Sequence, residues 1–282
     1  MKIDAHQHFW AIARGDYGWL TPELTALYRD FQPVDLEPEL AAQDIAGTVL
    51  VQAAPTVAET LYMLGLAAET DYIKGVVGWV DFESAEAGVQ IAELATDPQL
   101  VGLRPMIQDI EDDDWMLRPD LAPAFEALIA ADLTFDALTF PRHLANLSEL
   151  LARYPNMRVV VDHGSKPDIA DNVIEPWKNG MARIASETSA FVKLSGLVTE
   201  ASADWRVEDL KPYVDHLLET FGPDRMVWGS DWPVCTLAAS YGDWCATTDD
   251  LLAGLTAAQR DAVMGGTAQR AYHLAKSHDK DH

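Results

Sequence analysis

The chain has few cysteines and no long apolar run. Its 282 residues contain only two cysteines, Cys235 and Cys245, which cannot form a disulfide framework and which fit a reducing compartment. Its apolar stretches fall short of the roughly 18 residues that a membrane span requires. No leader-peptide pattern precedes the first strand-like segment, residues 3–9. We therefore expect a soluble, cytoplasmic protein.

Positive charge is also scarce in this sequence. Only 20 lysine and arginine residues stand against 45 aspartate and glutamate residues, which gives a formal net charge of −25. Nucleic acids and anionic membranes repel such a chain, so we expect neither as a partner. The acidic residues are spread along the sequence, as is typical of solvated helical surfaces. This composition leaves the oligomeric state open.

Eight short apolar runs recur along the chain, separated by segments with helical spacing. The runs are residues 3–9, 47–54, 74–80, 100–106, 133–140, 158–164, 191–197 and 225–232. Buried strands that alternate with helices indicate a parallel sheet covered on both faces. Eight such units in about 230 residues predict an α/β fold, a (β/α)8 TIM barrel. An open doubly wound sheet is the alternative, but the glycine-rich phosphate turn of a dinucleotide site is missing.

Two polar stretches look like loop insertions that distort one end of this barrel, residues 15–31 and residues 108–120. No linker or shift in composition marks a second domain. We therefore expect a single barrel domain over residues 1–282, with a short polar tail at residues 275–282.

Polar side chains gather at the carboxyl ends of the predicted strands, where the active sites of TIM barrels lie. His6 and His8 on the first strand share a face, because strand side chains alternate with period two. Further polar residues end the fourth, sixth and eighth strands: Arg104, His163, Lys166 and Asp231. We expect all of them to converge on one site at the carboxyl ends of the strands.

This ordered set resembles the active sites of the amidohydrolase superfamily. The motifs IDAHQHFW, GLRPMIQDI, FPRHL, VVVDHGSKP, KLSGL and WGSDWPVC are similar to those of its sugar-lactonase branch, which includes L-fuconolactonase and L-rhamnono-lactonase. The resemblance extends from residue 3 to about residue 274, and 2-pyrone-4,6-dicarboxylate lactonases are more distant relatives. It implies an enzyme that hydrolyses an aldono-1,4- or 1,5-lactone, such as L-fucono- or L-rhamnonolactone, to the aldonic acid.

The resemblance assigns Asp231 as the catalytic base, and a carboxylate within hydrogen-bond reach can activate water. The alternative is a structural aspartate in the SDWP turn. Two catalytic roles and one structural role are open for the histidines His6, His8 and His163. Together with Asp231 they can form a single-zinc site that lowers the pKa of bound water. Otherwise they bind the lactone carbonyl and stabilise the oxyanion directly, or merely line a polar barrel mouth.

The residues of the fourth and fifth strands bear on whether the activity of this protein requires a metal. Metal-dependent members of the superfamily usually add a histidine or a carboxylated lysine there, whereas this chain has Arg104 and Asp136. We therefore expect that one divalent ion, zinc first, can bind but is not required for activity.

Four residues are expected to contact the substrate. Arg104 has a planar guanidinium cation whose N–H donors suit a carboxylate or several hydroxyls. The alternative is a structural ion pair with Asp136. Lys166 can reach the lactone or tie its loop to an acidic neighbour. Trp19 offers an aromatic face to a sugar ring, and Arg142 begins the loop after the fifth strand. Asp162 should face away from His163 if the sixth strand is regular.

Two other functions stay open beside hydrolysis of a sugar lactone. One is another reaction of the same superfamily, a dicarboxylate or pyrone lactonase or a non-oxidative decarboxylase. The decarboxylase chemistry normally relies on a firmly bound divalent metal. The other is a non-catalytic protein that binds a sugar acid, although Asp231 and all three histidines are intact. Fold-level analogy does not decide between reactions.

Overall fold

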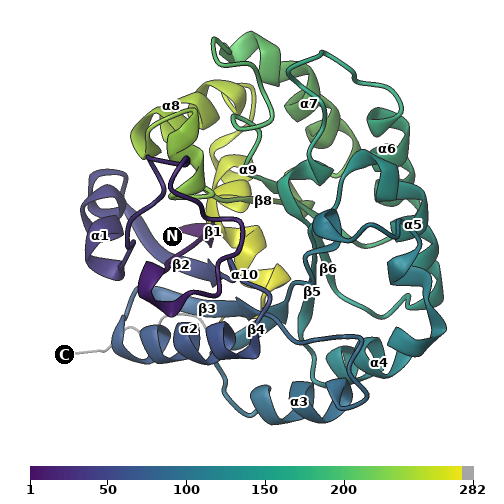
Figure 1. Ribbon diagram of the computed structural model, residues 1–282. Coiled ribbons are helices and arrows are strands. Elements are labelled where there is room, and N and C mark those ends of the chain that lie inside the picture. The colour runs from purple at the N-terminus through teal and green to yellow at the C-terminus, as the bar shows by residue number, and fades with distance from the viewer. Residues whose placement is uncertain (275–282) are drawn as a thin grey trace.

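The computed structural model describes residues 1–274, and the polar tail expected at residues 275–282 lies outside the described residues. Eight parallel strands form one sheet in sequence order (Figure 1). They are β1 (Lys2–Gln7), β2 (Ile45–Val51), β3 (Ile73–Gly78), β4 (Leu100–Leu103), β5 (Thr134–Ala137), β6 (Val159–Val161), β7 (Phe191–Leu194) and β8 (Met226–Trp228). The predicted TIM barrel is confirmed.

The barrel closes where β1 meets the segment that follows β8. Gln7 and Trp232 form a parallel bridge, and two backbone hydrogen bonds reinforce it. The His8 amide donates to the Trp232 carbonyl at 2.7 Å, and the Asp231 amide donates to the His6 carbonyl at 2.7 Å. The closure therefore joins the first and last predicted site residues through the main chain.

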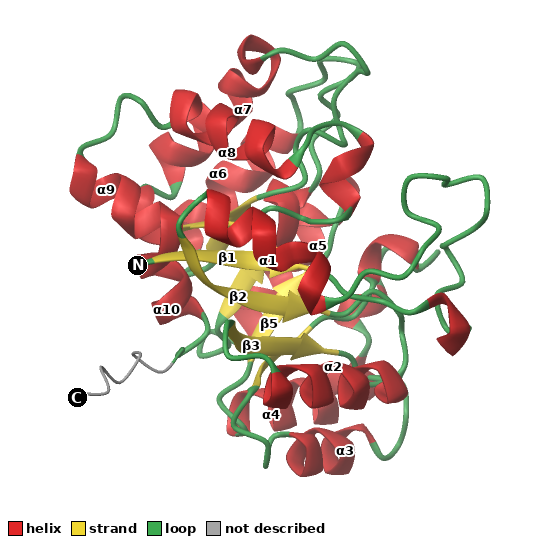
Figure 2. Cartoon of the chain, turned by 90° about the vertical axis from the view of Figure 1, so that its left-hand side faces the viewer, coloured by secondary structure: helices red, strands yellow, loops and turns green. Residues whose placement is uncertain are grey.

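Helices follow the strands and cover the outside of the barrel (Figure 2). They are α1 (Pro33–Ala42), α2 (Val57–Glu69), α3 (Ala87–Leu94), α4 (Ala122–Ala130), α5 (Leu144–Arg153), α6 (Trp177–Glu187), α7 (Val207–Thr220), α8 (Tyr241–Leu251), α9 (Ala257–Asp261) and α10 (Thr267–Ala271). Within residues 1–274, none of the helices combines the length and the hydrophobicity needed to cross a bilayer.

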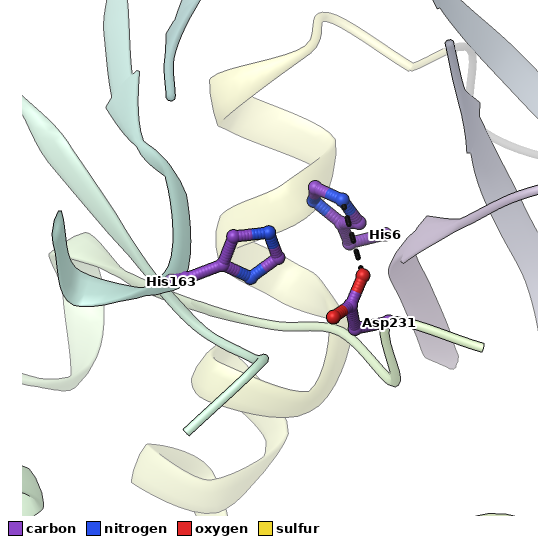
Figure 3. A group of neighbouring side chains, drawn as sticks. All are labelled: His6, His163 and Asp231. Atoms are coloured by element: carbon purple, nitrogen blue, oxygen red, sulfur yellow. Dashed lines mark ion pairs between the residues drawn. The ribbon is translucent and has the colours of Figure 1, made fainter. Parts of the chain in front are cut away.

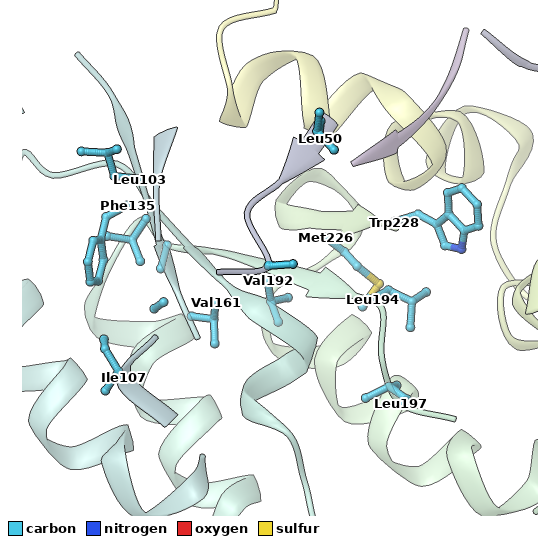
Figure 4. Close-up of a cluster of buried hydrophobic side chains, with 14 of the residues drawn as sticks. Leu50, Leu103, Ile107, Phe135, Val161, Val192, Leu194, Leu197, Met226 and Trp228 are labelled. Carbon is cyan, nitrogen blue, oxygen red and sulfur yellow. The ribbon is translucent and has the colours of Figure 1, made fainter. Parts of the chain in front are cut away.

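The strands are apolar on both faces because each face packs against a different layer. In β2, Leu50 belongs to the large cluster between sheet and helices, whereas Val49 and Val51 belong to a smaller cluster inside the barrel. β6 repeats the pattern, with Val161 in the outer cluster and Val160 in the inner one. Figure 4 shows part of the outer layer. This double burial explains why the strands appear as continuous apolar runs in the sequence.

The C-terminal segment closes the end of the barrel opposite the carboxyl ends of the strands. Ala271 and Tyr272 are buried within the inner cluster, together with Ile3 and Ala5 of β1. The Thr134 hydroxyl donates to the Ala271 carbonyl at 2.7 Å. α10 and the residues after it therefore form the floor of the barrel interior.

The observed strands end two to four residues earlier than the sequence predicts. The predicted runs continued into segments that are mostly buried but no longer extended. His163 and Asp231, which follow β6 and β8, have φ angles of 52° and 59°. This left-handed conformation is uncommon for residues other than glycine. The chain leaves the sheet there, which turns these side chains towards the barrel axis.

Candidate active site

A cavity of about 200 Å³ lies at the carboxyl ends of the strands. Six of the predicted site residues line it: His8, Trp19, Arg104, His163, Lys166 and Asp231. The remaining lining is a mainly apolar wall with two polar neighbours: Ala53, Met106, Leu138, Val234, Gln108 and Asp109. The cavity is smaller than the roughly 300–1,000 Å³ of typical ligand sites, which restricts its ligand to a small molecule.

The two histidines of the first strand lie beside the carboxylate that follows the last strand. His6 and His8 have their ring centroids 4.9 Å apart. Asp231 Oδ1 lies 3.7 Å from His6 Nε2 and 3.2 Å from His8 Nε2. His8 Nδ1 lies 2.7 Å from the Val51 carbonyl oxygen. Because a carbonyl can only accept, Nδ1 donates this hydrogen bond, and Nε2 of His8 is the nitrogen that faces Asp231.

The Asp231 carboxylate is held in its ionised form. Burial by itself raises the pKa of this group, but His163, His8 and His6 together hold the pKa below its ordinary value. The side chain is 7% exposed, so these interactions act with little screening by solvent. An ionised carboxylate at the wall of the cavity is the form that a general base requires.

His163 is fixed by a close contact with the loop after β7. Its Nδ1 lies 2.9 Å from the hydroxyl oxygen of Ser195. Gly196 has a φ angle of +64°, and a Cβ at this position would lie 2.4 Å from His163 Nδ1. Only glycine therefore fits beside the imidazole. Burial lowers the pKa of His163 to about 4, so the ring is neutral near pH 7.

Arg104 is anchored in the barrel by polar partners. Its Nη2 donates to Gln52 Oε1 at 3.0 Å and also to the Gln52 carbonyl, and its Nη1 donates to Asp162 Oδ2 at 3.3 Å. The ion pair that the sequence suggested with Asp136 is therefore made with Asp162 instead. Asp162 is fully buried on the interior side. The expectation that it faces away was wrong, because β6 ends at Val161 and strand alternation stops there.

Of the two roles that the sequence left open for Lys166, the structure shows the tie to an acidic neighbour. Lys166 lines the cavity, and its Nζ lies 3.6 Å from Glu200 Oε1. Arg142, in contrast, is not among the residues that line this cavity. It lines a neighbouring hollow together with Lys166, and it donates to Asp113 Oδ1 at 2.8 Å and to the Gln108 carbonyl at 3.2 Å. Arg142 therefore supports the loop that carries Gln108.

Trp19 lies over the cavity in the insertion that follows β1. Its indole N–H donates to the Ala53 carbonyl at 2.7 Å. The fully buried carboxylate of Glu59, in the first turn of α2, accepts hydrogen bonds from the amides of Ala53 at 3.1 Å and of Ala54. Burial raises the pKa of Glu59 to about 7. Glu59 therefore holds the segment against which Trp19 is anchored.

A cluster of buried charges lies beneath the cavity, and the sequence patterns do not predict it. The Lys193 ammonium lies 2.6 Å from Asp136 Oδ2 and 2.9 Å from Asp162 Oδ1, and 3.1 Å from His6 Nδ1. The Tyr272 hydroxyl donates to Asp136 at 2.8 Å. The available signal was a charged residue within an apolar strand, as in FVKL and LTFDAL, because such a residue is rarely buried without a partner.

Comparison with known proteins shows which protein family this chain belongs to. The profile of the family described as Amidohydrolase matches residues 3–274. An L-fucono-1,5-lactonase of Burkholderia ambifaria is 45% identical over 287 residues, covering 100% of this chain and 98% of that protein. The chain belongs to the amidohydrolase family. The superfamily resemblance in the sequence motifs is thereby confirmed.

Two further relatives of this amidohydrolase cover almost its full length. An L-fucono-1,5-lactonase of Burkholderia multivorans is 36% identical and covers 99% of this chain and 98% of that protein. A crystal structure of an amidohydrolase from Burkholderia multivorans with bound zinc superposes with a TM-score of 0.92. It is 36% identical and covers 98% of this chain and 100% of that one.

Three side chains of this amidohydrolase fit a metal ion. His6, His163 and Asp231 each offer one ligand atom, and these atoms lie within 4.8 Å of one another (Figure 3). Two imidazoles and a carboxylate match a catalytic zinc site, in which three protein ligands leave a position for water. The fourth expected ligand, His8, stands outside this group of three, although its Nε2 faces Asp231.

Proposed function

We propose that this protein hydrolyses the ester bond of a sugar lactone, an aldono-1,5-lactone such as L-fucono-1,5-lactone, to the aldonic acid. One observation carries the proposal. Asp231, an ionised carboxylate, lies at the wall of a small cavity within 3.7 Å of two imidazoles from the opposite end of the chain. The relatives that cover its full length and carry a curated activity are L-fucono-1,5-lactonases.

In the proposed reaction, a water molecule hydrogen-bonded to Asp231 attacks the acyl carbon of the lactone. Asp231 accepts a proton from the water as the new C–O bond forms. The carbonyl oxygen becomes an oxyanion, which is stabilised by cationic N–H donors that line the cavity, Arg104 and Lys166. The acyl bond to the ring oxygen then breaks, and the leaving alkoxide takes the proton from Asp231. The product is an aldonate with one new hydroxyl group, and one proton is released to solvent.

The lining of the cavity supports a sugar ring as the ligand. The cations of Arg104 and Lys166, with Gln108 and Asp109, offer donors and acceptors for ring hydroxyls. Trp19 and the apolar part of the wall offer nonpolar surface. Such surface suits the C–H face of a sugar and a terminal methyl group such as that of an L-fucono-lactone. A small cavity of this mixed character suits a monosaccharide lactone.

A zinc ion held by His6, His163 and Asp231 would lower the pKa of a bound water and polarise the lactone carbonyl. The side chains by themselves already provide a base and N–H donors. We therefore propose that the ion can bind without being required for turnover.

A panel of aldono-1,4- and 1,5-lactones, assayed by proton release with and without a chelator, tests the proposal. We expect hydrolysis of at least one 1,5-lactone and retained activity with the chelator. Asp231→Asn should lower kcat by about 10²- to 10⁴-fold. Asp215→Asn, which changes an exposed carboxylate of α7 outside the cavity lining, is the matched control and should keep the wild-type kcat. The proposal is wrong if no lactone of the panel is hydrolysed, or if Asp231→Asn turns over as fast as the wild type.

A further inference from the structure

Four consecutive residues after β6 have a left-handed backbone. His163, Gly164, Ser165 and Lys166 have φ angles of 52°, 55°, 61° and 47°. The Lys166 amide donates to the His163 carbonyl at 2.9 Å, which closes the segment into one tight turn. Side chains three positions apart in such a turn point the same way. The turn therefore carries His163 and Lys166 to one side, and both line the cavity.

Contacts from other elements have to maintain this left-handed turn. The conformation is unfavourable for residues that carry a Cβ, so a run of it persists only where the surroundings determine it. The hydroxyl groups of Ser165 and Thr139 lie 2.9 Å apart and form a hydrogen bond. A Cβ on Gly164 would lie 3.3 Å from Leu217 Cδ1, so the turn also packs closely against α7.

A buried tryptophan holds the middle of the turn. The indole N–H of Trp177 donates to the Gly164 carbonyl at 2.6 Å. Trp177 is the first residue of α6, the helix that follows β6, and it is 1% exposed. A buried backbone carbonyl needs a hydrogen-bond partner, and Gly164 is buried. Removing the indole N–H would therefore leave the turn without the donor that holds its central peptide.

The same arrangement occurs after β8, at the segment that carries Asp231. The carbonyl of Gly229, two residues before Asp231, accepts from the indole N–H of Trp244 at 2.9 Å. Trp244 is fully buried in α8, the helix that follows β8. Gly229 also packs closely against β1, where a Cβ would lie 2.6 Å from His6 Cβ. The indole therefore fixes the start of this segment, while the Asp231 amide donates to the His6 carbonyl.

Neither indole is among the residues that line the cavity, so each acts through the residues of the segment that it holds. We propose that Trp177 and Trp244 are positioning residues. Trp177 holds the turn that presents His163 and Lys166 to the cavity, and Trp244 holds the segment that presents Asp231. This inference rests on the proposed lactone hydrolysis, in which Asp231 activates water and Lys166 stabilises the oxyanion. Groups that are fixed before the substrate arrives need no reorganisation during the reaction.

The first experiment replaces each tryptophan by phenylalanine, which removes the N–H group and keeps an aromatic ring. A misplacement of about 1 Å can lower a rate by about 10²-fold, so we expect Trp177→Phe and Trp244→Phe each to lower kcat by about 10- to 10²-fold. For Trp244→Phe, KM should stay within about threefold of the wild type. The control is Trp205→Phe, which removes an indole bond of 3.1 Å to the Ala238 carbonyl, outside the cavity lining. It should keep the wild-type kcat. A rise in KM with unchanged kcat in both variants would contradict the inference.

A double-mutant cycle with Lys166→Met separates positioning from a general loss of order. Trp177 acts on the turn that carries Lys166, so the effect of Trp177→Phe on kcat should be at least about threefold smaller once Lys166 is methionine. Trp244→Phe acts on Asp231 and should keep its full effect in the same background. Equal effects of Trp177→Phe in the two backgrounds would overturn the role of Trp177. A loss of the Trp244→Phe effect would overturn the separate role of Trp244.

Crystal structures of the two variants and the wild type test the positioning without any substrate. In Trp177→Phe, the side chains of His163 and Lys166 should move by about 1 Å or more, while Asp231 stays in place. In Trp244→Phe, Asp231 should move and the turn should stay. Site residues that keep their wild-type positions in both variants would overturn the inference, whatever the kinetic results are.

The two proposals fail in different ways. If the wild type hydrolyses no lactone, the proposed function is wrong, and the crystal structures still test the roles of Trp177 and Trp244. If the wild type hydrolyses a lactone and both variants keep its kcat, only the positioning roles are wrong. Where a phenylalanine variant does not fold, β-(3-benzothienyl)alanine takes its place at the same position. This residue has the shape of tryptophan with a sulfur in place of the N–H group, so it removes the hydrogen bond alone.

Discussion

Replacing Glu59 by glutamine should reduce the pH dependence of the free energy of unfolding. Glu59 is fully buried, and burial raises its pKa from 4.5 to about 7. The folded chain therefore binds this proton more tightly than the unfolded chain does. The stability that this group contributes is fully present below the unfolded-state pKa and is lost as the pH rises through about 7.

The magnitude follows from these two pKa values. Between about pH 5 and about pH 8, proton linkage for this one group amounts to about 2.5 kcal/mol of stability lost on going to the higher pH. Glutamine binds no proton, so the variant lacks this contribution. Glutamine also has one acceptor oxygen where Glu59 uses two, for the amides of Ala53 and Ala54. The variant should therefore be about 1–3 kcal/mol less stable under acidic conditions.

Urea unfolding followed by tryptophan fluorescence, at both pH values, measures the effect. Other buried carboxyls with raised pKa values, Asp4 at about 6 and Asp136 at about 7, contribute equally to both proteins and cancel in the difference. Glu69→Gln, at an exposed position of the same helix, is the control and should behave like the wild type. If the wild type and Glu59→Gln lose the same stability within about 0.5 kcal/mol, the reasoning about Glu59 is refuted.

Two further predictions concern the residues around the cavity. Gly196→Ala should lower kcat by more than about tenfold, because its Cβ would overlap the His163 ring, whereas Gly222→Ala, with φ +71° and nothing within 4 Å of the Cβ, should only cost about 1–2 kcal/mol of stability. Equal kcat values for the two variants would disprove the contact. Trp19→Phe removes the hydrogen bond to Ala53 and should raise KM for a lactone several-fold with little change in kcat, and an unchanged KM would show that Trp19 does not hold the substrate.

The sequence predicted the barrel and the convergence of its strand ends because both depend on local patterns. Apolar runs and helical spacing define the eight units, and parallel strands necessarily bring their carboxyl ends together. The ends of the strands were predicted too late because the local sequence does not mark where the chain leaves the sheet before His163 and Asp231. Their left-handed backbone is a property of the assembled site, where contacts across the barrel outweigh local preference.

The buried charges could not be paired from the sequence. Arg104 and Lys193 each had several aspartates within reach of the barrel axis, and the choice between Asp136 and Asp162 depends on side-chain directions inside the barrel. Lys193 and His6 are separated by 187 positions, so no spacing rule connects them. What the sequence does offer is the presence of ionisable residues in strands that are otherwise apolar, and each such residue needs a partner.

The last described turn of the chain has a consequence for how this protein can be altered. Tyr272 reaches Asp136 from the floor of the barrel, and Asp136 touches the lysine that contacts the first histidine. Deleting or displacing residues 267–274 would thus disturb the buried charges around the first histidine. The change would act from the end of the barrel opposite the cavity, without altering a residue that lines the cavity. Affinity tags and fusion partners belong after residue 274, joined by a linker long enough to leave this floor of the barrel undisturbed.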